Sequence, residues 1–266
     1  MKKLAVIFLA LFVFLSISAC NGNEDSSTEI NVFAAASMTE TLDEIIELYK
    51  SVAPDVEIIA TYDSSGTLKT QIEEGAQCDL FISAAQKQMD QLDITKDESV
   101  NPDRLDFVVS DSRINLLENK VVLAVPDGNP SNVNNFSDIV NCNLIALGNS
   151  DVPVGSYSIE ILEYLGLDLQ ELENSGKITY GSNVKEVTTY ISEATVDCGI
   201  IYATDAFSEG LTVVDQATSD MCSQVVYPAA VIKSGNNPEA AQAFLDYLTG
   251  SEATEVFEKV GFTALS

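Results

Sequence analysis

One local pattern occurs four times in this chain, and it limits the folds that the chain can adopt. A short apolar run is followed by a turn rich in serine, glycine or proline, and apolar residues then recur at helical spacing. The apolar runs lie at 30–36, 56–62, 144–148 and 178–180. Strands that alternate with helices predict α/β layers with mainly parallel sheets. In such sheets, ligands bind at the carboxyl ends of the strands.

The first instance ends at Ser37, where the apolar strand stops and a helical pattern starts. Glu40 follows three residues later, so the segment Ser37-Met38-Thr39-Glu40 matches a capping box. In that motif, the serine and the glutamate satisfy unpaired N–H groups of the first helical turn. The sequence therefore predicts a capped helix N-terminus at Ser37.

The other three instances predict helix N-termini near Ser65, Val154 and Val184. Two of the four lie before the apolar strand 121–126, which we interpret as a crossing between domains, and the strand 225–232 is the predicted return. A helix N-terminus exposes unpaired N–H groups and the positive end of the helix dipole, so it attracts an anion without a cationic side chain. Two facing domains would direct such ends into one cleft.

The N-terminal segment is typical of an export signal. Lys2 and Lys3 precede twelve apolar residues, a run too short to span a bilayer, and small residues follow. Residues 17–20 resemble the bacterial lipobox, which predicts a signal peptide at 1–19 and a lipid on Cys20. The alternative is an ordinary signal peptide with an unrelated cysteine. Residues 20–29 are predicted to form a flexible tether, with the protein anchored to the outer face of the cell membrane or periplasmic.

The charge and the lack of histidine exclude several classes of function. Removing residues 1–19, which contain two lysines and no acidic residue, takes the formal charge from −28 to −30. Such a surface repels nucleic acid, so we predict no nucleic-acid partner. The chain has no histidine, which removes Ser-His-Asp and Cys-His arrangements and the usual zinc sites. A carboxylate pair such as Asp79 and Asp205 is the remaining catalytic alternative; we interpret them as strand-start and loop residues and predict no enzyme.

Four cysteines remain in the exported body if Cys20 carries lipid: Cys78, Cys142, Cys198 and Cys222. An exported protein permits a disulfide, and the four allow three complete pairings. The sequence does not choose among them, and Cys198 could equally be a free core thiol.

Six segments, in order, resemble the molybdate-binding proteins of ABC transporters. They are 31–37 (NVFAAAS), 64–68 (SSGTL), 78–84 (CDLFISA), 152–155 (VPVG), 199–206 (GIIYATDA) and 260–262 (VGF). The resemblance runs from about Ile30 to the C-terminus. It implies a type II periplasmic-binding-protein-like fold with two α/β lobes and a hinge of two crossing strands. Lobe 1 would comprise 30–121 plus 227–266, and lobe 2 would comprise 122–226.

The same resemblance implies an extracytoplasmic protein that captures molybdate or tungstate between its lobes and delivers it to an ABC permease. The oxyanion would be held by hydroxyls and amides of Ser37 and Ser65, the N–H groups of Val154 and Val184, and the phenol of Tyr202. Singly, these residues are equally typical of a turn serine, core valines and a packed aromatic. We predict a monomer without a cofactor or a free metal cation, molybdenum being present only in the oxyanion.

Two alternatives stay open from the sequence. The ligand could be another tetrahedral oxyanion such as sulfate or phosphate, or the protein could be a surface interaction protein without transport function. The chain also has Asp63 where the family often has a small neutral residue, and a carboxylate there would weaken anion binding unless it points away from the ligand.

Overall fold

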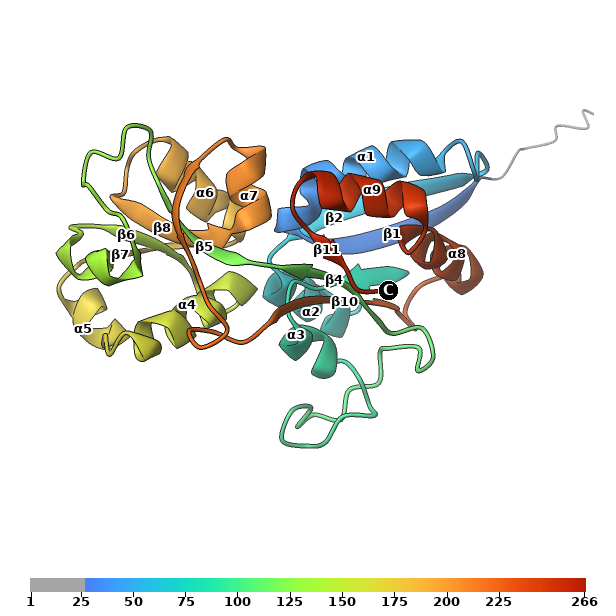
Figure 1. The fold of residues 1–266 in the computed structure, drawn as a ribbon. Helices are drawn as coiled ribbons and strands as arrows, with labels where there is room; N and C mark the ends of the chain where they lie inside the picture. The colour runs from blue at the N-terminus through green and yellow to red at the C-terminus, as the bar shows by residue number, and fades with distance from the viewer. Residues whose placement is uncertain (1–26) are drawn as a thin grey trace, which may run out of the picture.

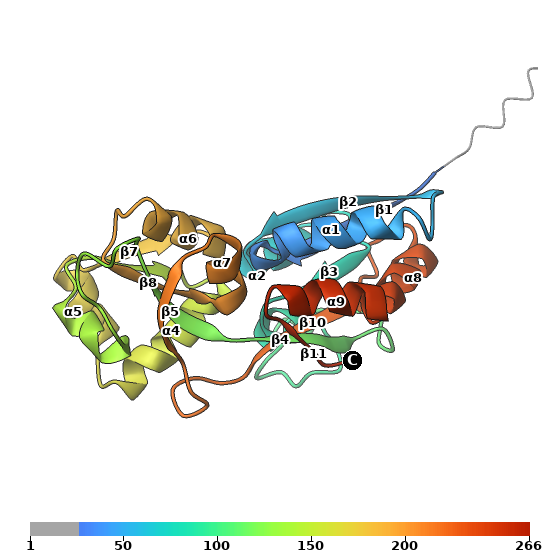
Figure 2. The ribbon, with the colours of Figure 1, turned by 45° about the horizontal axis from the view of Figure 1, so that its top comes forward.

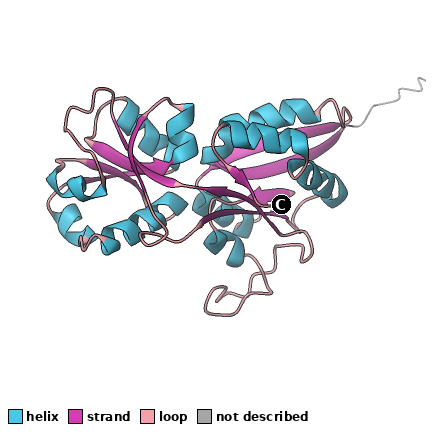
Figure 3. Cartoon of the chain, in the orientation of Figure 1, coloured by secondary structure: helices cyan, strands magenta, loops and turns pink. Residues whose placement is uncertain are grey.

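The computed structural model describes residues 27–266 and contains two β-sheets with helices on both sides (Figures 1 and 3). The first sheet has the strand order β11-β4-β10-β3-β1-β2. β1 pairs in parallel with β2 and β3, whereas β10 is antiparallel to β3 and β4, and β11 is antiparallel to β4. Its strands are β1 (Thr28–Ala35), β2 (Val56–Asp63), β3 (Leu80–Ile82), β4 (Ile114–Asn119), β10 (Val225–Val231) and β11 (Thr263–Ala264).

The second sheet has the strand order β7-β6-β8-β5-β9. β6 is parallel to β7 and β8, and β5 is antiparallel to β8 and β9. Its strands are β5 (Val121–Val125), β6 (Ile145–Gly148), β7 (Ile178–Gly181), β8 (Cys198–Tyr202) and β9 (Thr212–Gln216). Both sheets are therefore mixed, not mainly parallel as predicted, because the crossing strands β5 and β10 enter each sheet against its parallel strands.

Each sheet and its helices form one lobe. The first lobe carries α1 (Thr39–Tyr49), α2 (Ser65–Glu73), α3 (Gln86–Asp90), α8 (Pro238–Leu248) and α9 (Ser251–Lys259). The second carries α4 (Pro153–Tyr164), α5 (Leu169–Asn174), α6 (Val184–Ser192), α7 (Ala203–Ser208) and the 3₁₀ helix η2 (Phe136–Asn141). The two-lobed α/β fold that the sequence predicts is confirmed. Within residues 27–266, no helix is both long enough and apolar enough to cross a membrane.

Two segments connect the lobes (Figure 2). The chain leaves the first sheet after β4 and enters β5 at once, with Lys120 between them, and it returns between β9 and β10. In β10 the pairing register shifts between Tyr227 and Pro228, as expected for a proline, which cannot donate to the ladder. The lobe boundaries at 121/122 and 226/227 stay a prediction.

Side chains of β1 alternate between two layers of helices. Val32 and Ala34 pack in the cluster that includes α1, whereas Phe33 packs in a second cluster with Leu68 of α2. Strand side chains point alternately to opposite faces, so a strand covered on both faces must be apolar throughout. The apolar run at 30–36 is explained by this double burial.

Several sequence expectations need correction. β1 begins at Thr28, so Thr28 and Glu29 belong to the sheet, not to the predicted tether; Thr28 N–H donates to the Asp55 carbonyl at 2.7 Å. The rest of the tether, the signal peptide and Cys20 lie outside the described residues. The sequence also missed most of β4, together with α5, α7 and β9.

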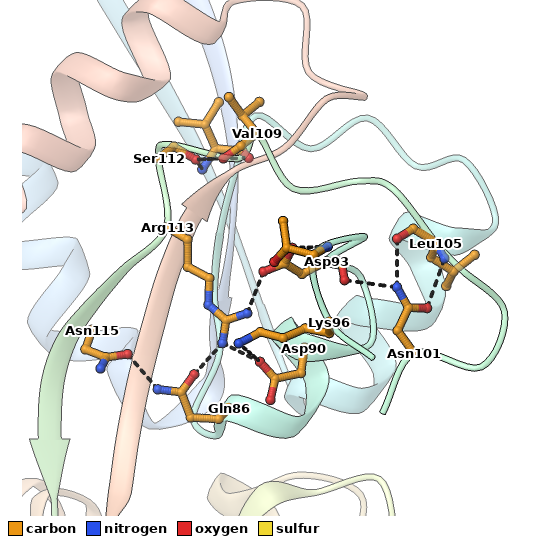
Figure 4. Close-up of polar contacts among 12 residues, drawn as sticks. Gln86, Asp90, Asp93, Lys96, Asn101, Leu105, Val109, Ser112, Arg113 and Asn115 are labelled. Atoms are coloured by element: carbon orange, nitrogen blue, oxygen red, sulfur yellow. Dashed lines mark hydrogen bonds and ion pairs between the residues drawn. The ribbon is translucent and has the colours of Figure 1, made fainter. Parts of the chain in front are cut away.

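A long segment between α3 and β4 is held by polar contacts instead of secondary structure (Figure 4). The Arg113 guanidinium binds Asp93 at 2.8 Å and also contacts Asp90 and Gln86. The Asn101 side chain bonds both backbone groups of Leu105. Burial opposes ionisation of Asp93, but hydrogen bonds from Thr95 and Arg113 hold its pKa below the usual value.

Candidate functional site

The four predicted helix starts meet where the lobes face each other. The 3₁₀ helix η1 (Ala36–Met38), which leads into α1, follows β1, and α2 follows β2; α4 and α6 follow β6 and β7. α6 of the second lobe lies against η1 of the first. A small cavity, with about 10 Å³ open to the centre of a water-sized sphere, lies between them. It is lined by Ala35, Ala36, Ser37, Asp63, Ser64, Ser65, Ala84, Val152, Pro153, Val184 and Tyr202.

Four of the five predicted site residues line this cavity, and Val154 directly follows Pro153, which lines it. Val154 is the second residue of α4, after Pro153, and Val184 is the first residue of α6. Backbone N–H groups of a first turn have no carbonyl partner within the helix. Pro153 has no N–H, and at the start of α4 this costs no hydrogen bond.

Ser37 does not cap a helix, so the predicted capping box is wrong. Ser37 lies inside η1, and α1 has no side-chain cap. Its hydroxyl is 2.8 Å from the hydroxyl of Tyr227, whereas Glu40 binds Lys185 of the second lobe at 2.7 Å. The 3₁₀ turn starts one residue before Ser37. The side chains of Ser37 and Glu40 therefore point away from the N–H groups in the first turn of α1.

Ser64 and Ser65 both line the cavity, and Ser64 also caps α2. The Ser64 hydroxyl accepts from the N–H of Thr67 at 3.1 Å and caps α2. Ser65 is fully buried, and its hydroxyl accepts from the N–H of Ala84 at 2.9 Å. A serine hydroxyl both donates and accepts, so this contact leaves the Ser65 O–H free to donate to a ligand.

Tyr202 ends β8 with a buried phenol. Its hydroxyl has no hydrogen-bond partner among the described residues, although the side chain is only 1% exposed. Burial raises the pKa of Tyr202 well above its ordinary value, and neighbouring Tyr227 raises it further. The group is therefore a neutral phenol with an unused O–H donor. Leaving such a buried group unpaired costs about 1–3 kcal/mol.

The sequence did not identify three residues that support the site: Asn119 at the end of β4, Tyr227 in β10 and Thr204 in α7. The Asn119 amide donates to the Tyr227 hydroxyl at 3.2 Å and to the Thr204 hydroxyl at 2.9 Å. Since Tyr227 also contacts Ser37, one hydrogen-bonded chain connects a cavity residue to both crossings between the lobes. For Tyr227, the sequence offered one signal: a tyrosine directly before a proline inside an apolar strand.

Further polar contacts among the described residues join the lobes around the cavity. The Gly66 N–H donates to the Asp151 carbonyl at 3.1 Å, and the Lys185 ammonium binds Glu40. The Asn183 amide lies 3.5 Å from Asp63, whose carboxylate also accepts from the Ser64 N–H at 2.7 Å. Donors of the protein itself therefore satisfy part of the hydrogen-bonding capacity of the Asp63 carboxylate in the cavity wall.

A buried carboxylate lies beside this interface. Asp205 is fully buried, lacks a hydrogen-bond partner among residues 27–266, and lies 3.7 Å from the Lys185 ammonium. Burial raises the pKa of Asp205 to about 7, and Lys185 opposes the shift. The carboxylate of Asp79 instead accepts from the N–H groups of Asn31 and Asn237 in the first lobe. The two carboxylates share no contact, so the geometry gives no support to an acid–base pair.

Comparison with known proteins agrees with this architecture. Residues 30–263 match the sequence profile of the family described as bacterial extracellular solute-binding protein. The chain belongs to this family. It is 36% identical over 274 residues to YvgL of Bacillus subtilis, whose name describes an ABC transporter substrate-binding lipoprotein, and the alignment covers 99% of each chain.

Two further relatives carry names that mention molybdenum or molybdate. The molybdate-binding protein ModA of Escherichia coli K12 is 35% identical over 88% of this chain and 89% of its own length. A solved substrate-binding domain attributed to a molybdenum ABC transporter of Clostridium difficile is 34% identical, with a TM-score of 0.65 over 90% of this chain and all of its own. These relatives of the family are solute-binding proteins.

Proposed function

We propose that this protein is an extracytoplasmic receptor that captures molybdate or tungstate between its lobes and delivers it to the membrane permease of an ABC transporter. The names of the relatives support the ligand class. The observation that carries the proposal is the cavity itself. First-turn N–H groups from both lobes, the Ser65 hydroxyl and the unpartnered Tyr202 phenol are available to the same small space.

The cavity suits a fully ionised oxyanion because its donors are neutral and fixed. Helix N-termini carry partial positive charge, and in a closed, water-poor site the effective dielectric is low, so these dipoles stabilise a dianion strongly. Ser37, Ser65 and Tyr202 would donate through hydroxyls, and Val154 and Val184 through backbone N–H groups. The bound molecule is a ligand that leaves unchanged, not a cofactor, and the protein would perform no reaction.

Closure would couple binding to delivery. Ligand groups come from both lobes, so the oxyanion binds the closed form more tightly than any open form and shifts the equilibrium toward closure. A permease that recognises the closed form would then distinguish loaded from empty receptor. A lipid on Cys20 would keep a monomeric receptor at the outer face of the membrane.

Calorimetric titration with molybdate, tungstate, sulfate and phosphate tests the ligand. We expect tight binding of molybdate and tungstate and much weaker binding of the other two. Val154→Pro would remove one N–H donor, and Pro is tolerated in a first helical turn. Glu239→Pro is the matched control, since Glu239 is the exposed second residue of α8, which also begins with proline and does not line the cavity. Equal heats for all four anions, or no heat with molybdate and tungstate, would refute the proposal.

A further inference from the structure

Two buried cysteines face each other in the second lobe. Cys142 follows η2, and Cys198 is the first residue of β8. Their sulfur atoms are 3.5 Å apart, and neither side chain is more than 1% exposed. Within the part of the chain that the structure describes, this is the one pair of cysteine sulfurs in contact.

The other two cysteines of the folded body have different surroundings. The Cys78 thiol donates to the Leu80 carbonyl at 3.3 Å in the core of the first lobe. Cys222 is partly exposed in the segment between β9 and β10. Of the disulfides that these four cysteines could form, only the one that joins Cys142 to Cys198 starts from sulfur atoms in contact.

We infer that Cys142 and Cys198 form a disulfide in the exported protein, with Cys78 and Cys222 remaining thiols. The inference rests on the proposed export, because disulfides persist outside the cytoplasm. The sulfurs must approach from 3.5 Å to a bond of about 2.05 Å. Asn141 and Asn143 on either side of Cys142 are exposed, so this surface segment can shift without repacking the core.

The reaction is an exchange with the disulfide of an extracytoplasmic thiol oxidoreductase. The hydrogen bond with Cys198 lowers the pKa of the Cys142 thiol, so Cys142 loses its proton first and attacks one sulfur of the oxidant. The oxidant's own S–S bond breaks and releases its first thiolate. Cys198 then loses its proton and attacks the Cys142 sulfur, which releases the second. Two electrons and two protons pass to the oxidant, which ends as a dithiol.

The bond would strengthen the second lobe without touching the oxyanion donors. Cys198 begins β8, and Tyr202 ends it at the cavity, so the crosslink lies at the other end of the strand. It would close a loop that includes β6, α4, α5, β7 and α6. A crosslink restricts the unfolded chain, so it raises stability. We therefore expect redox state to change stability and to leave oxyanion affinity unchanged.

Peptide mapping tests the pairing directly. The full chain is exported in a bacterial host, alkylated under denaturing conditions without reductant, and cleaved after glutamate. Cys142 then lies in peptide 119–160, Cys198 in 194–209 and Cys222 in 210–239. We expect 119–160 linked to 194–209, with Cys78 and Cys222 alkylated. Alkylation of all four cysteines in protein recovered outside the cytoplasm, or a link to Cys222, would overturn the inference.

Thermal unfolding with and without reductant supplies a second measurement. Reductant should lower the Tm of the wild-type protein and leave the Tm of Cys142→Ala unchanged; Cys222→Ala is the matched control and should keep the wild-type response. An equal effect of reductant on wild type and Cys142→Ala would count against the bond. Cell fractionation tests export separately, and molybdate titration tests the proposed function. A failure of export or of molybdate binding can therefore be distinguished from the absence of the disulfide.

Discussion

Replacing Tyr202 with phenylalanine should weaken oxyanion binding without weakening the fold. The Tyr202 hydroxyl is buried and has no partner among residues 27–266, so its removal costs the folded protein no hydrogen bond. A hydrogen bond to a charged group contributes about 1.5–3 kcal/mol. At 1.4 kcal/mol per factor of ten, loss of this donor should raise the Kd for molybdate by roughly 10- to 150-fold. The free energy of unfolding should stay constant or rise.

Tyr227→Phe is the matched control because it removes the same atom from a satisfied position. The Tyr227 hydroxyl contacts Ser37 at 2.8 Å and Asn119 at 3.2 Å, and both partners are buried. Leaving them unpaired should cost about 1–3 kcal/mol of stability. The changes in the free energy of unfolding of the two variants, measured in urea without ligand, should therefore differ in sign or size.

Urea unfolding and calorimetric titration of both variants provide the assay. Comparison of midpoints is valid where the slope with denaturant stays constant. We assign the Tyr202 hydroxyl as a donor to the ligand. This assignment is refuted if Tyr202→Phe binds molybdate with wild-type affinity, or if it loses as much stability as Tyr227→Phe.

Three further predictions follow from charged groups. Lys185→Met should weaken molybdate binding about 2- to 5-fold at low salt and less at high salt, because the ion pair of Lys185 with Glu40 is partly exposed. Adding Glu40→Gln to this variant should cause little further loss of affinity. If titration shows that the losses of the two substitutions add, the contact between Lys185 and Glu40 is contradicted. The pKa of Asp205 is raised to about 7, so the folded state keeps a proton that the unfolded carboxyl loses near pH 4. Stability should therefore fall as pH rises from about 4 to 7 and then level off, and urea midpoints of Asp205→Asn should lack this slope. Arg113→Met should cost about 3 kcal/mol in urea unfolding, because Asp93 loses its cation while Asp90 keeps only its pair with Lys96. Molybdate affinity should stay unchanged, and unaltered stability would show that the segment before β4 is held by other contacts.

The sequence predicted the strand-to-helix junctions well because each rests on local chemistry. Ser64 caps α2 and Pro153 starts α4, and both residues mark these positions whatever the rest of the chain does. β9 and most of β4 were missed because their residues are less apolar, and only pairing with β5 and β10 makes them strands.

The site was predictable in its helix ends and unpredictable in its cross-lobe contacts. Ser37 and Glu40 match a local motif, but each finds a better partner far along the chain, Tyr227 and Lys185. Such pairs depend on how two lobes meet, and sequence spacing carries no information about that. Asp63 stands where the family often has a small neutral residue, and its partner also lies in the other lobe, where Asn183 faces it.

A row of aromatic rings that includes the cavity residue Tyr202 should also give an intrinsic spectroscopic signal of lobe closure. Tyr157, Tyr202, Tyr227 and Phe262 contact one another edge to face in a row, with centroid separations of 6.4, 5.9 and 5.3 Å. The row runs from the second lobe into the first. The chain has nine tyrosines and no tryptophan, so no indole signal masks the phenols. Opening the lobes would change the packing of this row, and near-ultraviolet circular dichroism of the tyrosines should follow closure without any attached dye.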